Sequence, residues 1–269
     1  GIFRYLKGTA GIGHNRYSTT GSNKIINVQP LLAADREGPV AIGHNGNLTN
    51  TRELYESLNR SGAIFQTTLD SEIIIHLTAM SKKGTFLERL TEALKKVEGA
   101  NGFRPLCLGK VDDAWIVASE TCALDIINAE YIRDIEPGEI VSIDRNGVHS
   151  VKPLKKTKPS FCIFEYIYFS RPDSYIYGHC VDTVRRQIGK TLAREHPVDA
   201  DLVISVPDSS NTAALGYAAE AGIPFEIGLI RNHYIGRTFI HPSQVTREHS
   251  VRIKFNPVRG VLEGRRVLV

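Results

Sequence analysis

From residue 181 onward, helical and strand-like patterns alternate, and this alternation constrains the fold more than any other feature of the chain. Apolar side chains at helical spacing predict a helix over 181–195, with one stripe formed by Val184, Ile188 and Leu192. Small residues predict a second helix over 209–222. Short apolar runs predict strands at 201–206, 224–230 and 265–269. Since strands joined through helices run parallel, this half predicts an α/β unit with a parallel sheet.

The first half has another pattern, in which helices are followed by a run of short strands. Helices are expected over 49–62, 71–84 and 85–99, and strands between 106 and 150. Asn50 with Glu53 has the spacing of a capping box, and Asp70 is placed to cap the second helix. The basic segment 151–161 contains two prolines, which is typical of a connection between two structural units. We therefore expect two domains, 1–155 and 156–269.

Composition excludes several classes of protein. The chain has 269 residues, 42% of them hydrophobic, and 33 Lys and Arg against 29 Asp and Glu. No apolar run approaches the roughly 20 residues that span a bilayer, and no signal peptide is apparent, so a cytoplasmic protein without membrane or nucleic-acid partners is expected. No CxxC pair occurs, and a disulfide framework is not expected from four widely spaced cysteines: Cys107, Cys122, Cys162 and Cys180.

The stretch "GHNRYSTTG" (13–21) raises the first hypothesis of a site. About thirty residues later, "AIGHNGNLTN" (41–50) shows the same pattern, an apolar run followed by Gly-His-Asn. An ordinary loop would explain the glycines and asparagines, but not a cation beside three hydroxyls. Two such strand ends predict one pocket for a small polar ligand.

"VISVPDSSNTAALG" (203–216) raises a second hypothesis, because a strand, a tight loop and a helix follow one another. Unpaired amides at the helix start, with Ser209 and Ser210, would bind an anion, and Asp208 could orient a metal ion or a hydroxyl. The alternative is an ordinary turn with serine as the helix cap. The long polar segment 233–257 is either a binding lid or a solvated surface loop; its basic side chains include Arg237, Arg247, Arg252 and Lys254.

Taken together, the motifs resemble the glutamine phosphoribosylpyrophosphate amidotransferases. The matching segments occur in family order along nearly the whole chain, and include "GHNRYSTTG", "NVQPLL", "AIGHNGNLTN", "TTLDSE", "NGFRPL", "FEYIYFSRPDS", "VPDSS" and "GLIRNHYIGRTFI". The resemblance implies an α+β half followed by an α/β half. The first would be an Ntn-hydrolase glutaminase sandwich of the αββα type, and the second a type I phosphoribosyltransferase domain with a parallel sheet, incomplete in this chain.

The resemblance also implies an activity. The first half would hydrolyse glutamine, and the ammonia would displace pyrophosphate from phosphoribosylpyrophosphate in the second half. The product would be phosphoribosylamine, at the first step of de novo purine synthesis, which makes the protein a glycosyltransferase that depends on Mg²⁺. Feedback purine nucleotides and a homo-oligomer would be expected as well.

Site roles follow from the same resemblance. Arg16, Thr19 and Asp70 would bind glutamine, with Arg16 on its α-carboxylate and Asp70 on its α-ammonium group. Asn45 and the Gly46 amide would form the oxyanion hole. At the pyrophosphate site the resemblance implies Asp208, Ser209, Ser210 and Arg237, with Ser209 as a Mg²⁺ ligand. Segment 233–257 would close over the substrate and exclude water.

The chain departs from the family pattern in three places. The family's nucleophilic cysteine stands before a Gly-Ile or Gly-Val start, whereas this sequence begins "GIF". About two strands are expected between "KKVEGA" and "NGFRPL", and the phosphoribosylpyrophosphate signature is expected after "RRVLV". The chain as written is therefore expected to catalyse neither half-reaction. Cys162 matches one ligand of a [4Fe–4S] cluster, which needs four thiolates.

Two other functions compete with this one. A non-catalytic homologue would bind glutamine or a sugar phosphate as a regulator, which the expected but absent cysteine favours and the retained Arg16 and Asp70 disfavour. Another Ntn amidotransferase, such as the one that makes glucosamine 6-phosphate, would share the first half. "VPDSS" followed by "GRTFI" does not fit its sugar-isomerase half.

Overall fold

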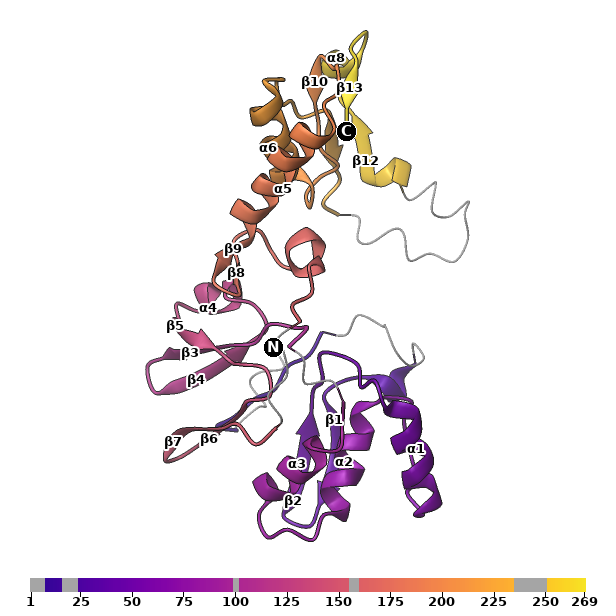
Figure 1. The fold of residues 1–269 in the computed structure, drawn as a ribbon, viewed down its shortest axis with the longest axis vertical. Coiled ribbons are helices and arrows are strands. Elements are labelled where there is room, and N and C mark those ends of the chain that lie inside the picture. Colours follow the sequence, from indigo (N-terminus) through magenta and orange to yellow (C-terminus); the bar gives the residue numbers. More distant parts are fainter. Residues whose placement is uncertain (1–7, 16–23, 99–101, 155–159, 235–250) are drawn as a thin grey trace. The chain divides into compact units, whose positions relative to one another are not determined.

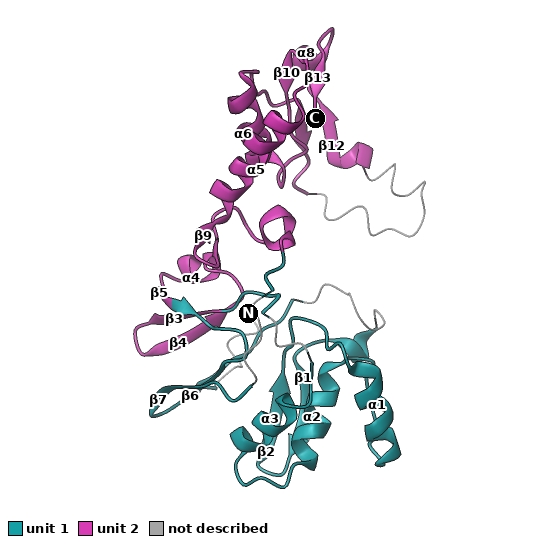
Figure 2. Cartoon of the chain, viewed as in Figure 1, with its two compact units in different colours: residues 1–106, 133–162 teal, residues 107–132, 163–269 magenta. Residues whose placement is uncertain are grey.

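The computed structural model describes residues 8–15, 24–98, 102–154, 160–234 and 251–269 (Figure 1). The chain forms two compact units, each continuous in space but not in sequence (Figure 2). Unit 1 contains residues 1–106 and 133–162, and unit 2 contains residues 107–132 and 163–269. The domain boundary expected near residue 155 stays a prediction.

Unit 1 combines antiparallel hairpins with three helices. Its elements are β1 (Leu31–Asp35), β2 (Gly38–Ile42), α1 (Thr51–Arg60), α2 (Ser71–Met80), α3 (Phe86–Leu94), β6 (Ile140–Asp144) and β7 (Gly147–Val151). Strand β1 pairs with β2, and β6 with β7, both antiparallel. The predicted helices of the first half are therefore present, each shorter than its sequence pattern.

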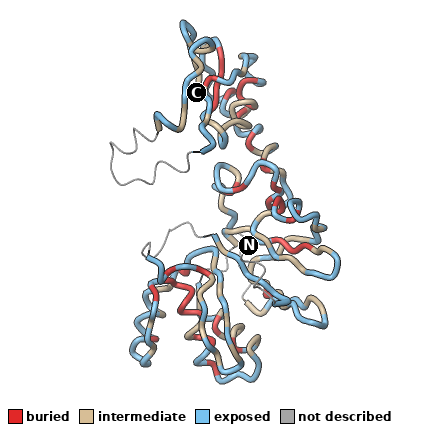
Figure 3. The backbone as a smooth tube through the Cα atoms, turned by 180° about the vertical axis from the view of Figure 1, so that it is seen from behind, coloured by how far each residue is buried: buried red, intermediate tan, exposed pale blue. Residues whose placement is uncertain are grey.

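The core of unit 1 forms where α2 packs against its neighbours, and α2 is the most buried helix of this unit (Figure 3). Apolar side chains from all three helices and from the loop before α1 build it: Leu48, Leu58, Ile73, Ile74, Leu77 and Ala93. Leu54, Leu90, Leu94 and Val97 pack against this cluster, so the predicted apolar faces of α1 and α3 do point inward.

The capping predictions were partly wrong. The Asn50 side chain makes no cap hydrogen bond; instead its amide donates to the Lys96 carbonyl at 2.9 Å and its oxygen accepts from the Glu98 amide at 3.0 Å. The capping box of this unit is formed by Thr85 and Glu88 at the start of α3. Local spacing could not separate the two, because a side chain can bond a distant loop as well as its own helix.

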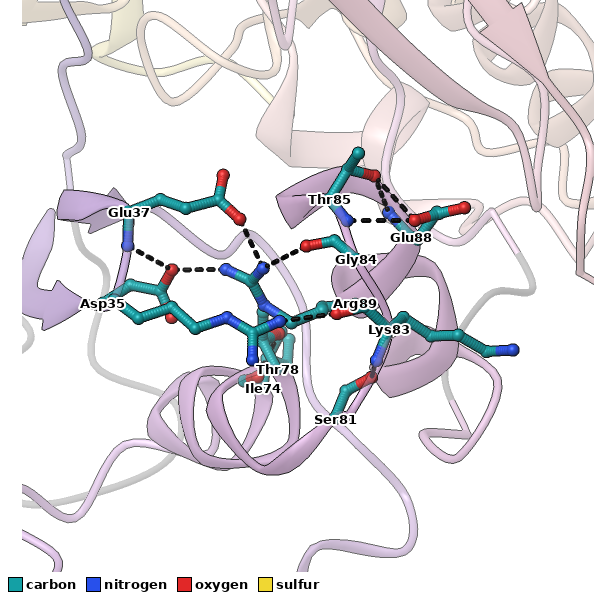
Figure 4. Close-up of polar contacts among 11 residues, drawn as sticks. Asp35, Glu37, Ile74, Thr78, Ser81, Lys83, Gly84, Thr85, Glu88 and Arg89 are labelled. Atoms are coloured by element: carbon teal, nitrogen blue, oxygen red, sulfur yellow. Dashed lines mark hydrogen bonds and ion pairs between the residues drawn. The ribbon is translucent and has the colours of Figure 1, made fainter.

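A buried arginine in α3 ties that helix to the turn of the β1–β2 hairpin (Figure 4). The Arg89 side chain is fully buried and forms ion pairs with Asp35 and Glu37, while its guanidinium donates to the Gly84 carbonyl at 3.1 Å. The sequence did not reveal it, because an arginine in an amphipathic helix normally faces solvent. Here two carboxylates and a carbonyl compensate the buried charge.

Unit 2 contains a small sheet of strand order β4–β3–β5 and a larger α/β part. The elements of the small sheet and its helix are β3 (Cys107–Val111), β4 (Ala114–Ala118), α4 (Cys122–Ile126) and β5 (Glu130–Asp134), of which the last two residues belong to unit 1. The α/β part contains β8 (Tyr175–Ile176), β9 (His179–Cys180), α5 (Val181–Glu195), β10 (Leu202–Val203), α6 (Asn211–Ala221), β11 (Leu229–Arg231), β12 (Phe255–Pro257), α8 (Arg259–Leu262) and β13 (Val267–Leu268).

The parallel pairing predicted for this half is present. Strand β10 pairs in parallel with β13, and Val203 forms a parallel bridge with Phe225 on its other side. The segment 224–230 was predicted as one strand, but β11 begins only at Leu229 and pairs antiparallel with β12. The two ends of the long polar segment are thereby held together, since the Asn232 amide donates to the Lys254 carbonyl at 2.7 Å.

Helix α5 has the predicted bounds but not the predicted buried face. Ile188 and Leu192 are 38% and 48% exposed, whereas the buried residues are Val181, Arg185, Gly189 and Ala193. The reason is a close approach of α6. A Cβ placed on Gly189 would lie 1.9 Å from the Ala213 carbonyl oxygen, and one on Gly216 would lie 2.1 Å from that of Arg186. Glycines therefore form the contact, and the larger side chains of the predicted stripe lie beside it.

Among the described helices, none has the length and apolarity needed to cross a membrane.

Candidate functional site

The structure brings the two Gly-His-Asn segments together, as the repeat predicted. A Cβ placed on Gly43 would lie 3.5 Å from His14 Nδ1 and 3.5 Å from the Ile12 side chain. Ile12 and His14 therefore lie beside Gly43, directly after β2; residues 8–15 form no strand, so the strand expected before the first motif is absent. Arg16 and Thr19, the predicted glutamine ligands that follow His14, lie outside the described residues, and their roles stay predictions.

Asp70 lies next to the second segment, at the start of α2. Its side chain is 7% exposed and makes no cap hydrogen bond with its own helix. Instead the Leu48 amide donates to Oδ2 at 2.9 Å, and His44 Nδ1 lies 3.3 Å from Oδ1. Burial by itself would raise the Asp70 pKa, but the hydrogen bonds from His44 and the Leu48 amide outweigh it and lower the pKa. The carboxylate is thus a fixed negative charge that suits a cationic ligand group.

The turn that follows β2 places the predicted oxyanion residues close to this carboxylate. The His44 amide donates to Gln29 Oε1 at 2.6 Å, which anchors the turn to the segment before β1. Gly46 has φ +156°, a conformation that side chains rarely adopt. A Cβ at Gly46 would also lie 3.2 Å from His44 Nε2. Asn45 and Gly46 are both exposed, so their amide groups can reach a ligand; their part in an oxyanion hole stays a prediction.

Three further side chains support this region and were missed in the sequence. Asn27 accepts from the Thr68 amide at 3.0 Å and donates to its hydroxyl at 2.9 Å. Glu72 accepts from the Gln66 and Thr67 amides, both at 2.8 Å. His44 is the third, and the only signal available for it was that histidine recurs in both copies of the motif.

The second candidate site lies in unit 2, between β10 and α6. The Ser205 hydroxyl donates to Asn211 Oδ1 at 2.7 Å, and the Ser210 hydroxyl donates to the Val206 carbonyl at 2.5 Å. Ser210 occupies the cap position of α6 without a side-chain cap bond, so the alternative of a simple serine cap is wrong. Asp208 and Ser209 are exposed. The Ser209 side chain is therefore exposed just before α6, whereas the Ser205 and Ser210 hydroxyls already donate within the protein.

Asp208 forms an ion pair with Arg231 of β11. Buried polar atoms without a partner within the described structure include Thr212 Oγ1 and Arg231 Nε, which belong to the same region. The Arg231 charge is balanced by Asp208 in this pair, and it occupies the carboxylate that was expected to orient a metal ion. Arg237, the other cation expected here, lies outside the described residues.

Metal sites were predicted at Ser209 and Cys162. The hydroxyl of Ser209 and the carboxylate of Asp208 are oxygen donors of the kind Mg²⁺ prefers, so this loop fits the ion in its chemistry. Cys162 does not fit a cluster formed within the described part of this chain, because the other cysteines do not gather around it. No three histidines, cysteines or acidic residues of the described part come together as a metal site.

Comparison with known proteins agrees with this geometry. A family model described as a glutamine amidotransferase domain matches residues 14–125, which include the His44–Asp70 region. The chain is 49% identical to the chloroplastic amidophosphoribosyltransferase of Vigna aconitifolia, over 98% of this chain and 58% of that protein. It is 46% identical to amidophosphoribosyltransferase of Bacillus subtilis, over 98% of this chain and 59% of the relative.

Two solved structures are similar over 94% of the chain. One is the glutamine phosphoribosylpyrophosphate amidotransferase of B. subtilis in complex with ADP and GMP, with a TM-score of 0.85 and 45% identity, over 59% of that chain. The other is described as the allosteric regulatory enzyme of purine biosynthesis, with a TM-score of 0.87 and 46% identity, over 58% of that chain. These likenesses confirm the predicted fold class.

The fold and the first site are thus similar to those of glutamine amidotransferases, with the family model matching residues 14–125. The chain is a homologue of the amidophosphoribosyltransferases, and the resemblance inferred from its motifs is confirmed. It spans between half and two thirds of the length of these curated relatives.

Proposed function

We propose that the chain contains the glutamine-binding half, and part of the phosphoribosyl-transferring half, of an amidophosphoribosyltransferase. The observation that carries this proposal is the buried Asp70 carboxylate, aimed by His44 and the Leu48 amide beside the Asn45–Gly46 turn. A fixed anion beside a turn with exposed amides matches a ligand that carries an ammonium group and an amide carbonyl. Glutamine has both, and the matching family model supports it.

In the glutaminase reaction, each group would act on a different part of glutamine. Asp70 would bind the α-ammonium group and Arg16 the α-carboxylate, with Thr19 beside it. Asn45 and the Gly46 amide would stabilise the negative charge that develops on the amide oxygen. The nucleophile would be the N-terminal cysteine that the resemblance implies. Ammonia released here would be the second substrate of the other half.

In the transferase reaction, the loop before α6 would hold the pyrophosphate group of phosphoribosylpyrophosphate. Asp208, Ser209 and Ser210 stand at the start of α6, where amides and the helix dipole favour an anion. Mg²⁺ at Ser209 would neutralise charge on the leaving pyrophosphate. Arg237 would add a cation once substrate is bound. Because Asp208 pairs with Arg231, the metal would have to compete for that carboxylate.

Several finer features belong to the same proposal. The complex of the B. subtilis relative with ADP and GMP supports regulation by purine nucleotides. A homo-oligomer and a cytoplasmic location are also proposed, although several relatives are named chloroplastic. A [4Fe–4S] cluster at Cys162 would need three thiolates from outside this chain, and we derive no step through it.

Glutamine binding tests the proposal directly. L-Glutamine is titrated into the ¹⁵N-labelled chain and followed by NMR, for the unaltered protein, for Asp70→Asn and for Asp144→Asn. The control, Asp144, also lies beside a histidine, with Oδ1 3.5 Å from His149 Nε2, but is half-exposed. Asp70→Asn should weaken binding by about 10- to 100-fold, the value of one charge-assisted hydrogen bond. The control should change nothing; equal affinities for all three proteins would refute the site.

Arg16 gives a second test, in a form of the protein that has the N-terminal cysteine and the complete transferase half. Arg16→Ala should raise the KM for glutamine strongly and leave synthesis from free ammonia nearly intact, because ammonia has no α-carboxylate. If both activities fell equally, Arg16 would not be a glutamine ligand.

A further inference from the structure

The His44 imidazole lies between the two halves of the proposed glutamine site. Its Nδ1 atom lies 3.3 Å from Asp70 Oδ1. Its Nε2 atom lies on the opposite side of the ring, where a Cβ on Gly46 would come within 3.2 Å of it. One side chain therefore contacts the carboxylate proposed for the ammonium group and lies beside the turn proposed for the amide oxygen.

The protonation of the ring follows from these contacts. An ionised carboxylate can only accept hydrogen bonds, so Nδ1 must carry the proton that points to Asp70. In the neutral ring, Nε2 is then the unprotonated nitrogen, and it is the one that faces Gly46. The backbone of His44 is fixed as well, because its amide donates to Gln29 Oε1 at 2.6 Å.

The two oxygens of Asp70 are held in different ways. Oδ2 accepts a 2.9 Å hydrogen bond from the Leu48 amide, a main-chain contact that no side-chain substitution removes. Oδ1 lies 3.3 Å from His44 Nδ1, the longer of these two contacts, and a carboxylate oxygen can accept a second donor. Oδ1 is thus the atom open to a ligand, and His44 is the side chain that decides where this atom points.

We infer that His44 is a positioning residue for the substrate α-ammonium group. It holds Asp70 Oδ1 in the orientation that accepts the ammonium group. It also fixes the position of that oxygen relative to the Gly46 turn. This inference rests on the proposed glutamine-binding function. The ligand class it predicts is an α-amino acid with a side-chain amide, because such a molecule carries an ammonium group for Asp70 and an amide oxygen for the Gly46 turn.

Two amide substitutions separate this role from a merely structural one. In His44→Asn the side-chain NH₂ takes the place of Nδ1, whereas in His44→Gln it takes the place of Nε2. His44→Phe keeps the ring and removes both nitrogens. His149→Phe is the matched control, since His149 also lies beside a carboxylate in unit 1 but is exposed.

The readout is the dissociation constant, from NMR titration, of L-glutamine and of 5-amino-5-oxopentanoate, which is glutamine without its α-amino group. Thermal unfolding of each variant verifies the fold. For glutamine, His44→Gln and His44→Phe should bind about tenfold more weakly, the factor of one hydrogen bond to a charged group, and His44→Asn should stay near the unaltered protein. For the deaminated analogue, all variants should bind alike.

Three results would overturn the inference. Equal losses for both ligands would mean that His44 only supports the fold, and unchanged glutamine binding in His44→Gln would mean that it does not act through Asp70. If His44→Phe fails to fold, the comparison of the Asn and Gln variants still decides. If the unaltered chain binds neither ligand, the glutamine-binding function itself is wrong, and the role of His44 falls with it.

Discussion

Replacing Gly189 or Gly216 by alanine should force helices α5 and α6 apart. The new methyl carbon would lie 1.9 Å from the Ala213 carbonyl oxygen in one case and 2.1 Å from the Arg186 carbonyl oxygen in the other, against an ordinary contact of at least 3.4 Å. Both obstructing atoms belong to helix backbones, which cannot rotate away as a side chain could. The axes must therefore separate by about 1.3 to 1.5 Å at the crossing, since no softer route relieves the contact.

The loss in the free energy of unfolding follows from two opposing effects. Overpacking a well-packed contact costs about 1–3 kcal/mol, and a rigid backbone clash belongs at the upper end. Alanine gains about 1 kcal/mol over glycine in a helix interior. The net loss for either single substitution is about 2 kcal/mol. The double substitution should cost less than the sum of the two, because the first methyl group already separates the helices.

Urea unfolding measures this loss in unit 2. The single tryptophan, Trp115, lies in β4 of the same unit and reports its unfolding by fluorescence, with helix content followed by circular dichroism. Gly260→Ala in α8 is the control, because a Cβ at Gly260 meets nothing within 4 Å. It should leave stability unchanged or slightly raised. A Gly189→Ala chain as stable as this control would refute the close packing of α5 and α6.

Three further predictions concern unit 1. At the buried Arg89, Asp35→Asn should lower the urea midpoint more than Glu37→Gln, because the Asp35 side chain is 10% exposed and that of Glu37 is 51% exposed; the reverse order would contradict the arrangement in Figure 4. The hydrogen bonds from Arg133 come first among the causes that lower the pKa of Glu139 from 4.5 to about 2. A lowered pKa contributes stability above the unfolded value, so up to about 3 kcal/mol should be lost as pH falls from 4.5 toward 2. In acid unfolding curves Glu139→Gln should lack this loss; an unchanged curve would remove Glu139 as its source. Asn45→Ala, in a form with the nucleophilic cysteine, should lower kcat for glutamine hydrolysis by about 10²–10³, and an effect on KM alone would exclude Asn45 from the oxyanion hole.

What the sequence could determine by itself was local in character. The period of apolar residues predicts that 181–195 is a helix, and α5 has these bounds. The repeated Gly-His-Asn motif predicts that its two copies lie close together, and His14 does lie beside Gly43, although residues 8–15 form no strand. Asp70 and the loop before α6 were recognised by residue type and by their place at helix starts. Such features depend on neighbours within a few residues, which a sequence displays directly.

The tertiary structure alone decided which distant group each residue meets. The buried stripe of α5 is set by Gly189 because α6 crosses there, and periodicity contains no information about a second helix. Arg89 is buried because Asp35 and Glu37, 54 and 52 residues earlier in the chain, come to lie beside it. His44 has a role only because Asp70, 26 residues later, lies within 3.3 Å of its ring. These contacts form when tertiary folding brings residues that are distant in the sequence together. A local pattern of residue types cannot specify which distant residue becomes the partner.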